Sequence, residues 1–160
     1  MNSTVILTPL GNLKIIENET KVRLIEFTSE NESSVTEGYL AKVVDELNEY
    51  FNGERQEFNF AMEPFGTEFQ KSVWQELVKI PYGQTISYHE LATRIGDPKT
   101  IRAAAAANGK NPIAIAIPCH RVIGSDGSMT GYAGGVERKK ALLRIEGANV
   151  MSQTELFNEV

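Results

Sequence analysis

Short apolar runs separated by polar turns open the chain, and this pattern indicates a small β-sheet followed by a helix. Three β-rich runs, at 5–7, 13–16 and 22–27, are separated by turn residues such as proline, glycine and asparagine. A polar loop is predicted at 30–36, and apolar side chains then recur at helical spacing over 35–51. These segments lack a convergent set of polar groups, so we expect them to form a scaffold.

Helical signals become clearer beyond a predicted linker at 52–66. Residues 67–70 and 87–90 both match the capping box, in which the first and fourth residues bond each other's backbone N–H. The first box predicts a helix through Ile80, and the second predicts a short helix that ends at 95–96. The inner face of the first helix is predicted to comprise Phe69, Val73, Trp74, Leu77 and Val78.

A third helix is predicted from Asp97-Pro98 to Asn108-Gly109. Two short helices joined by a tight, glycine-containing turn form a helix-turn-helix. The segment 124–135 is rich in glycine and serine and predicts a β-wing or loop, while 136–146 predicts a closing helix that Gly147 ends. The pattern as a whole indicates an α+β protein.

Charge divides the chain at the same place as the apolar pattern. Residues 1–63 carry 5 Lys/Arg and 12 Asp/Glu, a net charge of −7, whereas residues 64–150 carry 11 and 7, a net charge of +4. A tail at 151–160 adds −2, giving −5 for the chain. We therefore expect a scaffold domain at 1–63, a phosphate-facing domain at 64–150, and the tail.

Composition excludes several classes of protein and site. No stretch approaches the ~20 apolar residues of a membrane span, and the N-terminus lacks the pattern of a signal peptide. The single cysteine cannot form an internal disulfide, which favours a cytoplasmic location. One cysteine and two histidines also cannot complete a zinc site without carboxylates, so we expect no metal.

That single cysteine, Cys119, is followed directly by His120 and Arg121. A thiol is nucleophilic only as a thiolate, and an imidazole can take or relay its proton. The apolar run 113–117 ahead of it predicts a buried strand that delivers an exposed, ionisable sulfur to the strand end. The alternative is an inert core cysteine, but a core residue needs no base and cation beside it.

The second informative segment is an alanine-rich helix at 100–108. Alanine is the best helix former, so the segment can simply be a packed helix. A helix with few long side chains can also approach the minor groove of DNA closely. Arg102 would then fill the space of a base that has left the stack, as chemistry on a base generally requires.

Asn111-Pro112, five further residues and then Pro118 through Gly124 form a long, specific motif. Further segments that match are Ile80-Pro81-Tyr82-Gly83, Ser87-Tyr88, Arg102-Ala103, Tyr132-Ala133-Gly134-Gly135 and Ile145-Glu146-Gly147. On these residues, 65–148 resembles the O6-alkylguanine-DNA alkyltransferase family. The resemblance implies a winged helix-turn-helix alkyltransferase domain, preceded by a ribonuclease H-like domain built from a small sheet and a helix.

The resemblance also implies direct DNA repair, in which an alkyl group passes irreversibly from O6 of a flipped guanine to Cys119. In such proteins a histidine acts through a water held by a glutamate, and these roles fall on His120 and Glu146. Asn111 would order the surrounding loop, and Tyr88 would donate to the guanine ring as it gains electrons. The protein would act as a monomer without a cofactor, and would be consumed once per lesion.

Double-stranded DNA carrying O6-alkylguanine is the partner that the resemblance implies, with O4-alkylthymine as a further family substrate. Arg102 would replace the flipped nucleotide, and Tyr88 would crowd the phosphate. Further DNA contacts are expected at Ala103, Gly109, Arg121 and Ser125. The substrate pocket is expected to comprise Pro118, Val122, Tyr132 and Ala133. Ala133 stands where family members often have serine, and the zinc ligands of some members' N-terminal domains are absent.

Three alternatives compete with this interpretation. A non-catalytic lesion binder of the same fold would have a different residue at the position of the cysteine, but the cysteine is present here. A cysteine hydrolase could use Cys119, His120 and Glu146 as a triad, although no oxyanion-hole motif accompanies them. A helix-turn-helix regulator would need long polar side chains on its recognition helix, which the alanine-rich helix does not carry.

Overall fold

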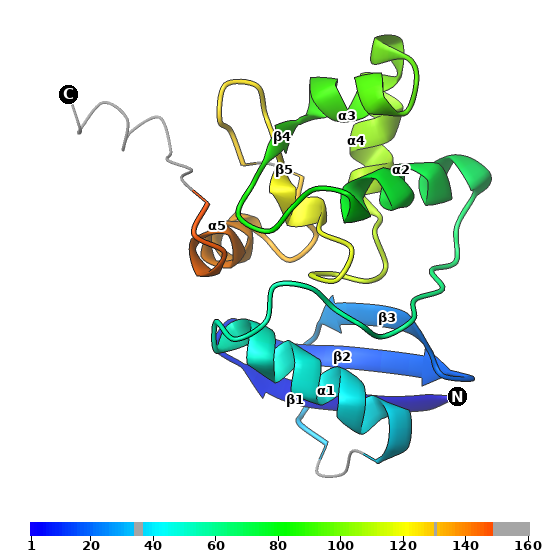
Figure 1. The fold of residues 1–160 in the computed structure, drawn as a ribbon, viewed down its shortest axis with the longest axis vertical. Coiled ribbons are helices and arrows are strands. Elements are labelled where there is room, and N and C mark those ends of the chain that lie inside the picture. The colour runs from blue at the N-terminus through cyan, green and yellow to red at the C-terminus, as the bar shows by residue number, and fades with distance from the viewer. Residues whose placement is uncertain (34–36, 130, 149–160) are drawn as a thin grey trace, which may run out of the picture. The chain divides into compact units, whose positions relative to one another are not determined.

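The computed structural model describes the chain except for residues 34–36, 130 and 149–160. The predicted tail therefore lies outside the described residues, as does part of the loop predicted at 30–36. The described residues form an α+β protein, as expected from the apolar pattern, and they divide into two compact units (Figure 1). Within them, no helix is both long and apolar enough to cross a membrane.

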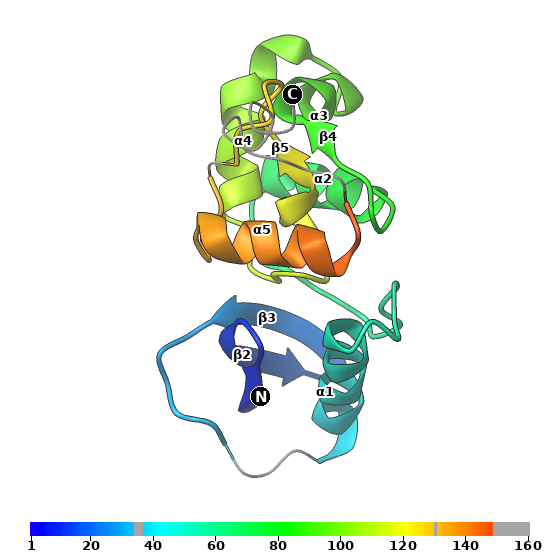
Figure 2. The ribbon, with the colours of Figure 1, turned by 90° about the vertical axis from the view of Figure 1, so that its left-hand side faces the viewer.

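The first unit, Met1–Phe65 with Pro112–Ala116, contains an antiparallel sheet with a helix against it (Figure 2). In order across the sheet its strands are β1 (Asn2–Thr8), β2 (Gly11–Asn18) and β3 (Lys21–Phe27), and its helix is α1 (Gly38–Phe51). Leu13 and Ile15 on β2 are fully buried while the residues between and beside them are less so, as expected for a strand with one covered face. The three strands and the described part of the helix are confirmed.

The apolar run ahead of the cysteine is buried, but it is not the strand that its composition predicts. The run forms a single β-bridge to β3, between Ile113 and Ile25. At this bridge the Ile25 N–H donates to the Pro112 carbonyl at 3.0 Å, and the Ala114 N–H donates to the Ile25 carbonyl at 2.8 Å. At Ile115 φ is 73°, and the Ala116 N–H donates back to the Ala114 carbonyl at 2.8 Å. This γ-turn satisfies the backbone locally and reverses the chain, so the strand prediction is wrong.

The second unit, Gly66–Asn111 with the described residues from Ile117 onward, is mainly helical. Its elements are α2 (Glu68–Val78), β4 (Ile86–Ser87), α3 (Tyr88–Arg94), η1 (Pro98–Thr100), α4 (Ile101–Gly109), η2 (Cys119–Arg121), β5 (Val122–Ile123) and α5 (Val136–Ile145). The two short strands, β4 and β5, run parallel and side by side (Figures 1 and 2). The predicted helix-turn-helix corresponds to α3, η1 and α4, and the described part of 124–135 is a loop.

Capping side chains mark where these helices begin. The Thr67 hydroxyl accepts from the Gln70 N–H at 3.1 Å, and the Gln70 side chain accepts from the Thr67 N–H at 3.0 Å, so the first capping box is confirmed. Ser87 accepts from the Glu90 N–H at 3.0 Å. The Glu90 carboxylate instead accepts from Arg94 at 3.1 Å, so the second box is only half formed.

α4 has one packed face and one exposed face. Ala104 and Ala107 are buried, and the buried Trp74 of α2 donates its indole N–H to the Ala107 carbonyl at 2.9 Å. Arg102 and Ala103 lie on the exposed side. The packed-helix interpretation and the exposed small-residue surface therefore both hold, on opposite faces.

The inner face of α2 is narrower than predicted. Val73, Trp74 and Leu77 are buried, but Phe69 is 38% exposed and Val78 is 50% exposed. Helical spacing alone predicts that all five side chains point inward. In the structure, the neighbouring helices cover only the central stripe of α2.

Candidate active site

A tight turn and two asparagine side chains position Cys119. Pro118 has φ −82° and ψ 64°, and the Cys119 N–H donates to the Ile117 carbonyl at 2.8 Å, which forms an inverse γ-turn. The proline ring favours this turn because it fixes φ in the required range. The Asn111 amide donates to the Ile117 carbonyl at 2.7 Å, and the Asn108 amide donates to the Cys119 carbonyl at 3.3 Å. The peptide groups on both sides of the turn are therefore held.

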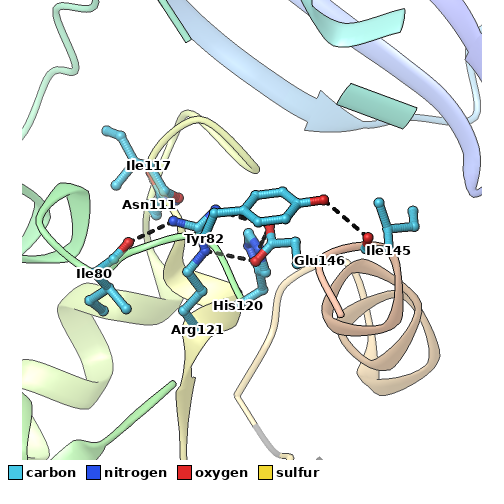
Figure 3. Close-up of polar contacts among 8 residues, drawn as sticks. All are labelled: Ile80, Tyr82, Asn111, Ile117, His120, Arg121, Ile145 and Glu146. Carbon is cyan, nitrogen blue, oxygen red and sulfur yellow. Dashed lines mark hydrogen bonds and ion pairs between the residues drawn. The ribbon is translucent and has the colours of Figure 1, made fainter. Parts of the chain in front are cut away.

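One buried carboxylate joins the two residues after the cysteine (Figure 3). Glu146 Oε2 lies 2.7 Å from His120 Nε2, and Arg121 donates to both carboxylate oxygens, at 2.8 Å and 3.0 Å. Arg121 also donates to the Ile80 carbonyl at 2.7 Å. The guanidinium of Arg121 neutralises the carboxylate and also donates to the Ile80 carbonyl. The ion pair is therefore stable although it is buried.

Tyr82 covers this cluster. Its hydroxyl donates to the Ile145 carbonyl at 3.1 Å, and its ring centre lies 5.8 Å from Arg121 Cζ (Figure 3). The ring reduces water access to the Arg121–Glu146 ion pair, which strengthens the interaction. The matched Ile80–Gly83 segment thus supports the site by packing on it.

The protonation states follow from these contacts. Burial alone would raise the pKa of Glu146, but hydrogen bonds from His120 and Arg121 outweigh it and lower this pKa to about 2. Burial lowers the pKa of His120 against the opposing effect of Glu146, so the imidazole is neutral at neutral pH. An ionised carboxylate can only accept, so the proton of His120 resides on Nε2. Nδ1 then keeps its lone pair, and it has no hydrogen-bond partner among the described protein atoms.

Cys119 is buried, with 6% of its surface exposed, so the expectation of an exposed sulfur is wrong for this structure. Burial raises the pKa of the thiol, while the Asn111 amide and the Lys139 ammonium oppose that shift. The surroundings are nevertheless polar, because Tyr88 and Tyr132 also interact electrostatically with the sulfur. A thiol in this environment needs a base to ionise near neutral pH.

Lys139 is a residue of the site that the sequence analysis missed. It is fully buried, and its Nζ lies 3.5 Å from the Tyr88 hydroxyl and 5.6 Å from the centre of the Tyr88 ring. Its spacing from Leu142 and Leu143 places it on the apolar inner face of α5, where all three are buried. A lysine in register with two core leucines was the available signal.

The residues expected to contact DNA lie in different environments. Ala103 and Ser125 are exposed with Arg102, and Gly109 is partly exposed. Arg121 is buried, and its guanidinium supports Glu146.

The four residues expected to line the pocket also differ in exposure. Pro118 and Val122 are buried, Tyr132 is partly exposed and Ala133 is exposed. In the described residues no group of three or more His, Cys, Asp or Glu is arranged to hold a metal ion.

Two family models together match most of the chain. The ribonuclease-like domain of 6-O-methylguanine DNA methyltransferase matches residues 1–64, and its DNA binding domain matches residues 68–148. The chain belongs to the 6-O-methylguanine DNA methyltransferase family. The fold class and the resemblance inferred from the sequence are therefore confirmed.

Relatives within the 6-O-methylguanine DNA methyltransferase family resemble nearly the whole chain. The methylated-DNA–protein-cysteine methyltransferase of Mycobacterium tuberculosis is 44% identical over 94% of this chain and 95% of its own length. The protein of the same name from Methanosarcina barkeri is 40% identical over 91% and 97%. The crystal structure of Mycobacterium tuberculosis OGT in complex with DNA is 41% identical, with a TM-score of 0.82 over 96% of this chain and 97% of that chain.

Proposed function

We propose that this protein repairs double-stranded DNA by transferring an alkyl group from O6 of guanine to Cys119. The observation that carries the proposal is the order of groups at the site: a cysteine, then a neutral imidazole, then an ionised carboxylate 2.7 Å from that imidazole. The relative solved in complex with DNA supports DNA as the partner.

The imidazole of His120 is suited to remove the thiol proton. With Nε2–H donated to Glu146, the lone pair on Nδ1 can take the proton of Cys119 through an intervening water, as the resemblance implies. The imidazolium that forms is stabilised by the carboxylate beside it. Asn111 favours the resulting thiolate, since its amide lowers the pKa of Cys119.

The transfer itself is a displacement at the alkyl carbon. The sulfur of Cys119 forms a bond to carbon, the carbon–O6 bond breaks, and its electron pair passes into the guanine ring. The Tyr88 hydroxyl donates a hydrogen bond to the ring as that charge develops, and the released guanine takes its proton from solvent. The product is a thioether with no easy leaving group, and the chain contains no second cysteine to accept the alkyl group. Each protein molecule therefore acts once.

Reaching O6 requires the guanine to leave the stack, because the sulfur is buried within the protein. The exposed side of α4 carries Arg102 beside the small Ala103, so the helix can enter the minor groove while Arg102 fills the vacated position. Ala133 would act through its backbone N–H, which makes the family's serine dispensable there. All these residues belong to one chain, so we propose a monomer.

Mass spectrometry of the Cys119 peptide tests this proposal. After incubation with duplex DNA carrying O6-methylguanine, we expect one added methyl group per protein molecule, with no further reaction when more lesion is supplied. Repeated turnover by unmodified protein would refute the single use. The same assay with O4-methylthymine tests whether an alkylated pyrimidine is also accepted.

The matched control is Cys119→Ala. This variant should bind the lesion duplex with the affinity of the original protein while transferring nothing, because the small side chain fits the same turn. Simultaneous loss of DNA binding and transfer would instead assign Cys119 a structural role.

A further inference from the structure

A buried oxygen without a hydrogen-bond donor lies beside the cysteine. Asn108, in the last turn of α4, is only 1% exposed, and its amide nitrogen donates to the Cys119 carbonyl at 3.3 Å. A carbonyl can only accept, so the nitrogen of the amide must face it. The oxygen of the same amide, Oδ1, is buried and has no hydrogen-bond partner among the residues that the structure describes. Such a group is uncommon in a folded protein and calls for an explanation.

Two side-chain donors around this end of α4 have other acceptors. The indole N–H of Trp74 donates to the Ala107 carbonyl at 2.9 Å, and the Asn111 amide donates to the Ile117 carbonyl at 2.7 Å. Leaving an acceptor buried without a donor costs free energy in the folded state. That cost is offset when a molecule that enters the site brings the donor.

Asn108 lies where the base of a lesion must come. Its side chain contacts the Cys119 carbonyl and also Tyr88: burial raises the pKa of Tyr88, and a hydrogen bond from the Asn108 side chain opposes that shift. These contacts place Asn108 between the proposed nucleophile and the proposed donor to the guanine ring. Cys119 is itself buried, so a base that reaches its sulfur enters the space around Asn108.

We propose that Asn108 is a specificity-determining residue, whose side-chain oxygen accepts a hydrogen bond from the exocyclic amine of O6-alkylguanine. This role rests on the proposed function and deepens it, because it names the feature by which the site selects its base. The hydrogens of that amine are the only hydrogen-bond donors on the base, since alkylation at O6 leaves N1 without a hydrogen. The base of O4-alkylthymine has no such donor, because its alkylation leaves N3 without a hydrogen.

Selection follows from the state of the oxygen in each complex. With O6-alkylguanine in the site, Oδ1 gains its missing donor while the amide nitrogen keeps the Cys119 carbonyl as its acceptor. With O4-alkylthymine in the site, Oδ1 stays buried and unpaired. A site with a buried acceptor therefore reacts poorly with a base that lacks the matching donor.

The test removes the donor from the substrate and the acceptor from the protein. O6-methylhypoxanthine is O6-methylguanine without the exocyclic amine, and Asn108→Leu replaces the amide by an apolar side chain of similar size. The measured quantity is the second-order rate constant of methyl transfer to the full-length protein from each base in the same duplex. The unsubstituted protein should react about 10-fold more slowly with O6-methylhypoxanthine. In Asn108→Leu, the rate constants for the two bases should differ by less than about 3-fold.

This comparison separates recognition of the amine from a structural role. Asn108→Leu also removes the donation to the Cys119 carbonyl, but that loss slows the reaction of both bases alike and cancels in their ratio. The preference for O6-methylguanine over O4-methylthymine should fall in the variant as well. The matched control is Asn48→Leu, which makes the same substitution at an exposed position of α1. It should leave every ratio unchanged.

The unsubstituted protein also gives a result that does not depend on the folding of a variant. Equal rate constants for O6-methylguanine and O6-methylhypoxanthine would overturn the role of Asn108. A difference of about 10-fold that persists in Asn108→Leu, or in Asn108→Ala if the leucine variant does not fold, would overturn it too. Failure of the unsubstituted protein to accept a methyl group from O6-methylguanine would instead refute the proposed function.

Discussion

At the scale of single residues, the chemistry depends on Glu146 remaining ionised while buried. Removing a carboxylate from water is costly, and the hydrogen bonds from His120 and Arg121 compensate for it. In return, the carboxylate fixes which nitrogen of His120 carries the proton. Arg121 acts here as a partner of Glu146, which explains why the residue after the Cys-His pair is a cation.

Glu146→Gln tests this dependence. The amide cannot balance Arg121 or hold the imidazolium, so we expect transfer to slow about 100-fold and the free energy of unfolding to fall by about 3 kcal/mol. Glu137→Gln is the control, because that side chain is 89% exposed. Single-turnover kinetics and denaturant titration measure the two effects, and a loss in both variants alike would refute the assignment.

The stability of the unsubstituted protein should also depend on pH through Glu146. Its pKa is lowered from 4.5 to about 2 on folding, so its contribution is complete above the unfolded value and is lost as the pH falls toward 2. That contribution amounts to about 3 kcal/mol. Because this contribution is lost at acid pH, the free energies of unfolding of Glu146→Gln and of the unsubstituted protein should converge as the pH falls toward 2.

At the scale of elements, α4 has two different faces. Alanine suits both faces of the helix. Its small side chain allows close packing against α2 on one face, and it does not project far from the exposed face. Arg102, near the first turn, is the long side chain on that surface. The element is therefore a packed helix with an exposed face of small residues, and we propose that this face enters the minor groove.

Arg102→Ala should separate duplex repair from chemistry. Without the side chain that replaces the flipped base, we expect repair of O6-methylguanine in duplex DNA to slow about 10-fold or more, since unstacking costs a few kcal/mol. Reaction with free O6-benzylguanine should be unchanged. Equal effects on the two substrates, measured as second-order rate constants, would remove the proposed role.

At the scale of the whole molecule, charge is divided along the chain. The segment 64–150 carries +4 while 1–63 carries −7, so the DNA-facing part has only a small excess of cations. The match of both segments to one family shows that this division follows the domain order of the family. We therefore expect affinity for DNA to depend less on phosphate neutralisation than on the fit of α4 and the lesion.

DNA binding should accordingly weaken only modestly with salt. With about four phosphates neutralised, the plot of log affinity against log salt should have a slope no steeper than about −4. Fluorescence anisotropy with a labelled duplex, from low to physiological salt, measures it. A slope near −10 would show that many more phosphates are contacted than the charge of this segment predicts.

The sequence by itself determined the elements whose signals are local. The capping box at Thr67, the cap at Asp97 and the helical spacing in α1 depend on residues a few positions apart, so they could be read directly. The motif around Cys119 gave the family and the proposed nucleophile for the same reason. The apolar run before it was misread, because a buried turn and a buried strand have the same composition.

Only the tertiary structure decided what surrounds the sulfur. Lys139 reaches Tyr88 across 51 positions, and no local pattern encodes such a contact. The pairing of Glu146 with His120, across 26 positions, followed from the family resemblance, but its direct 2.7 Å contact came only from the structure. The burial that raises the pKa of Cys119 is likewise a sum over distant elements. The sequence therefore indicated which atom we propose to react, and the fold determined the electrostatic environment of that atom.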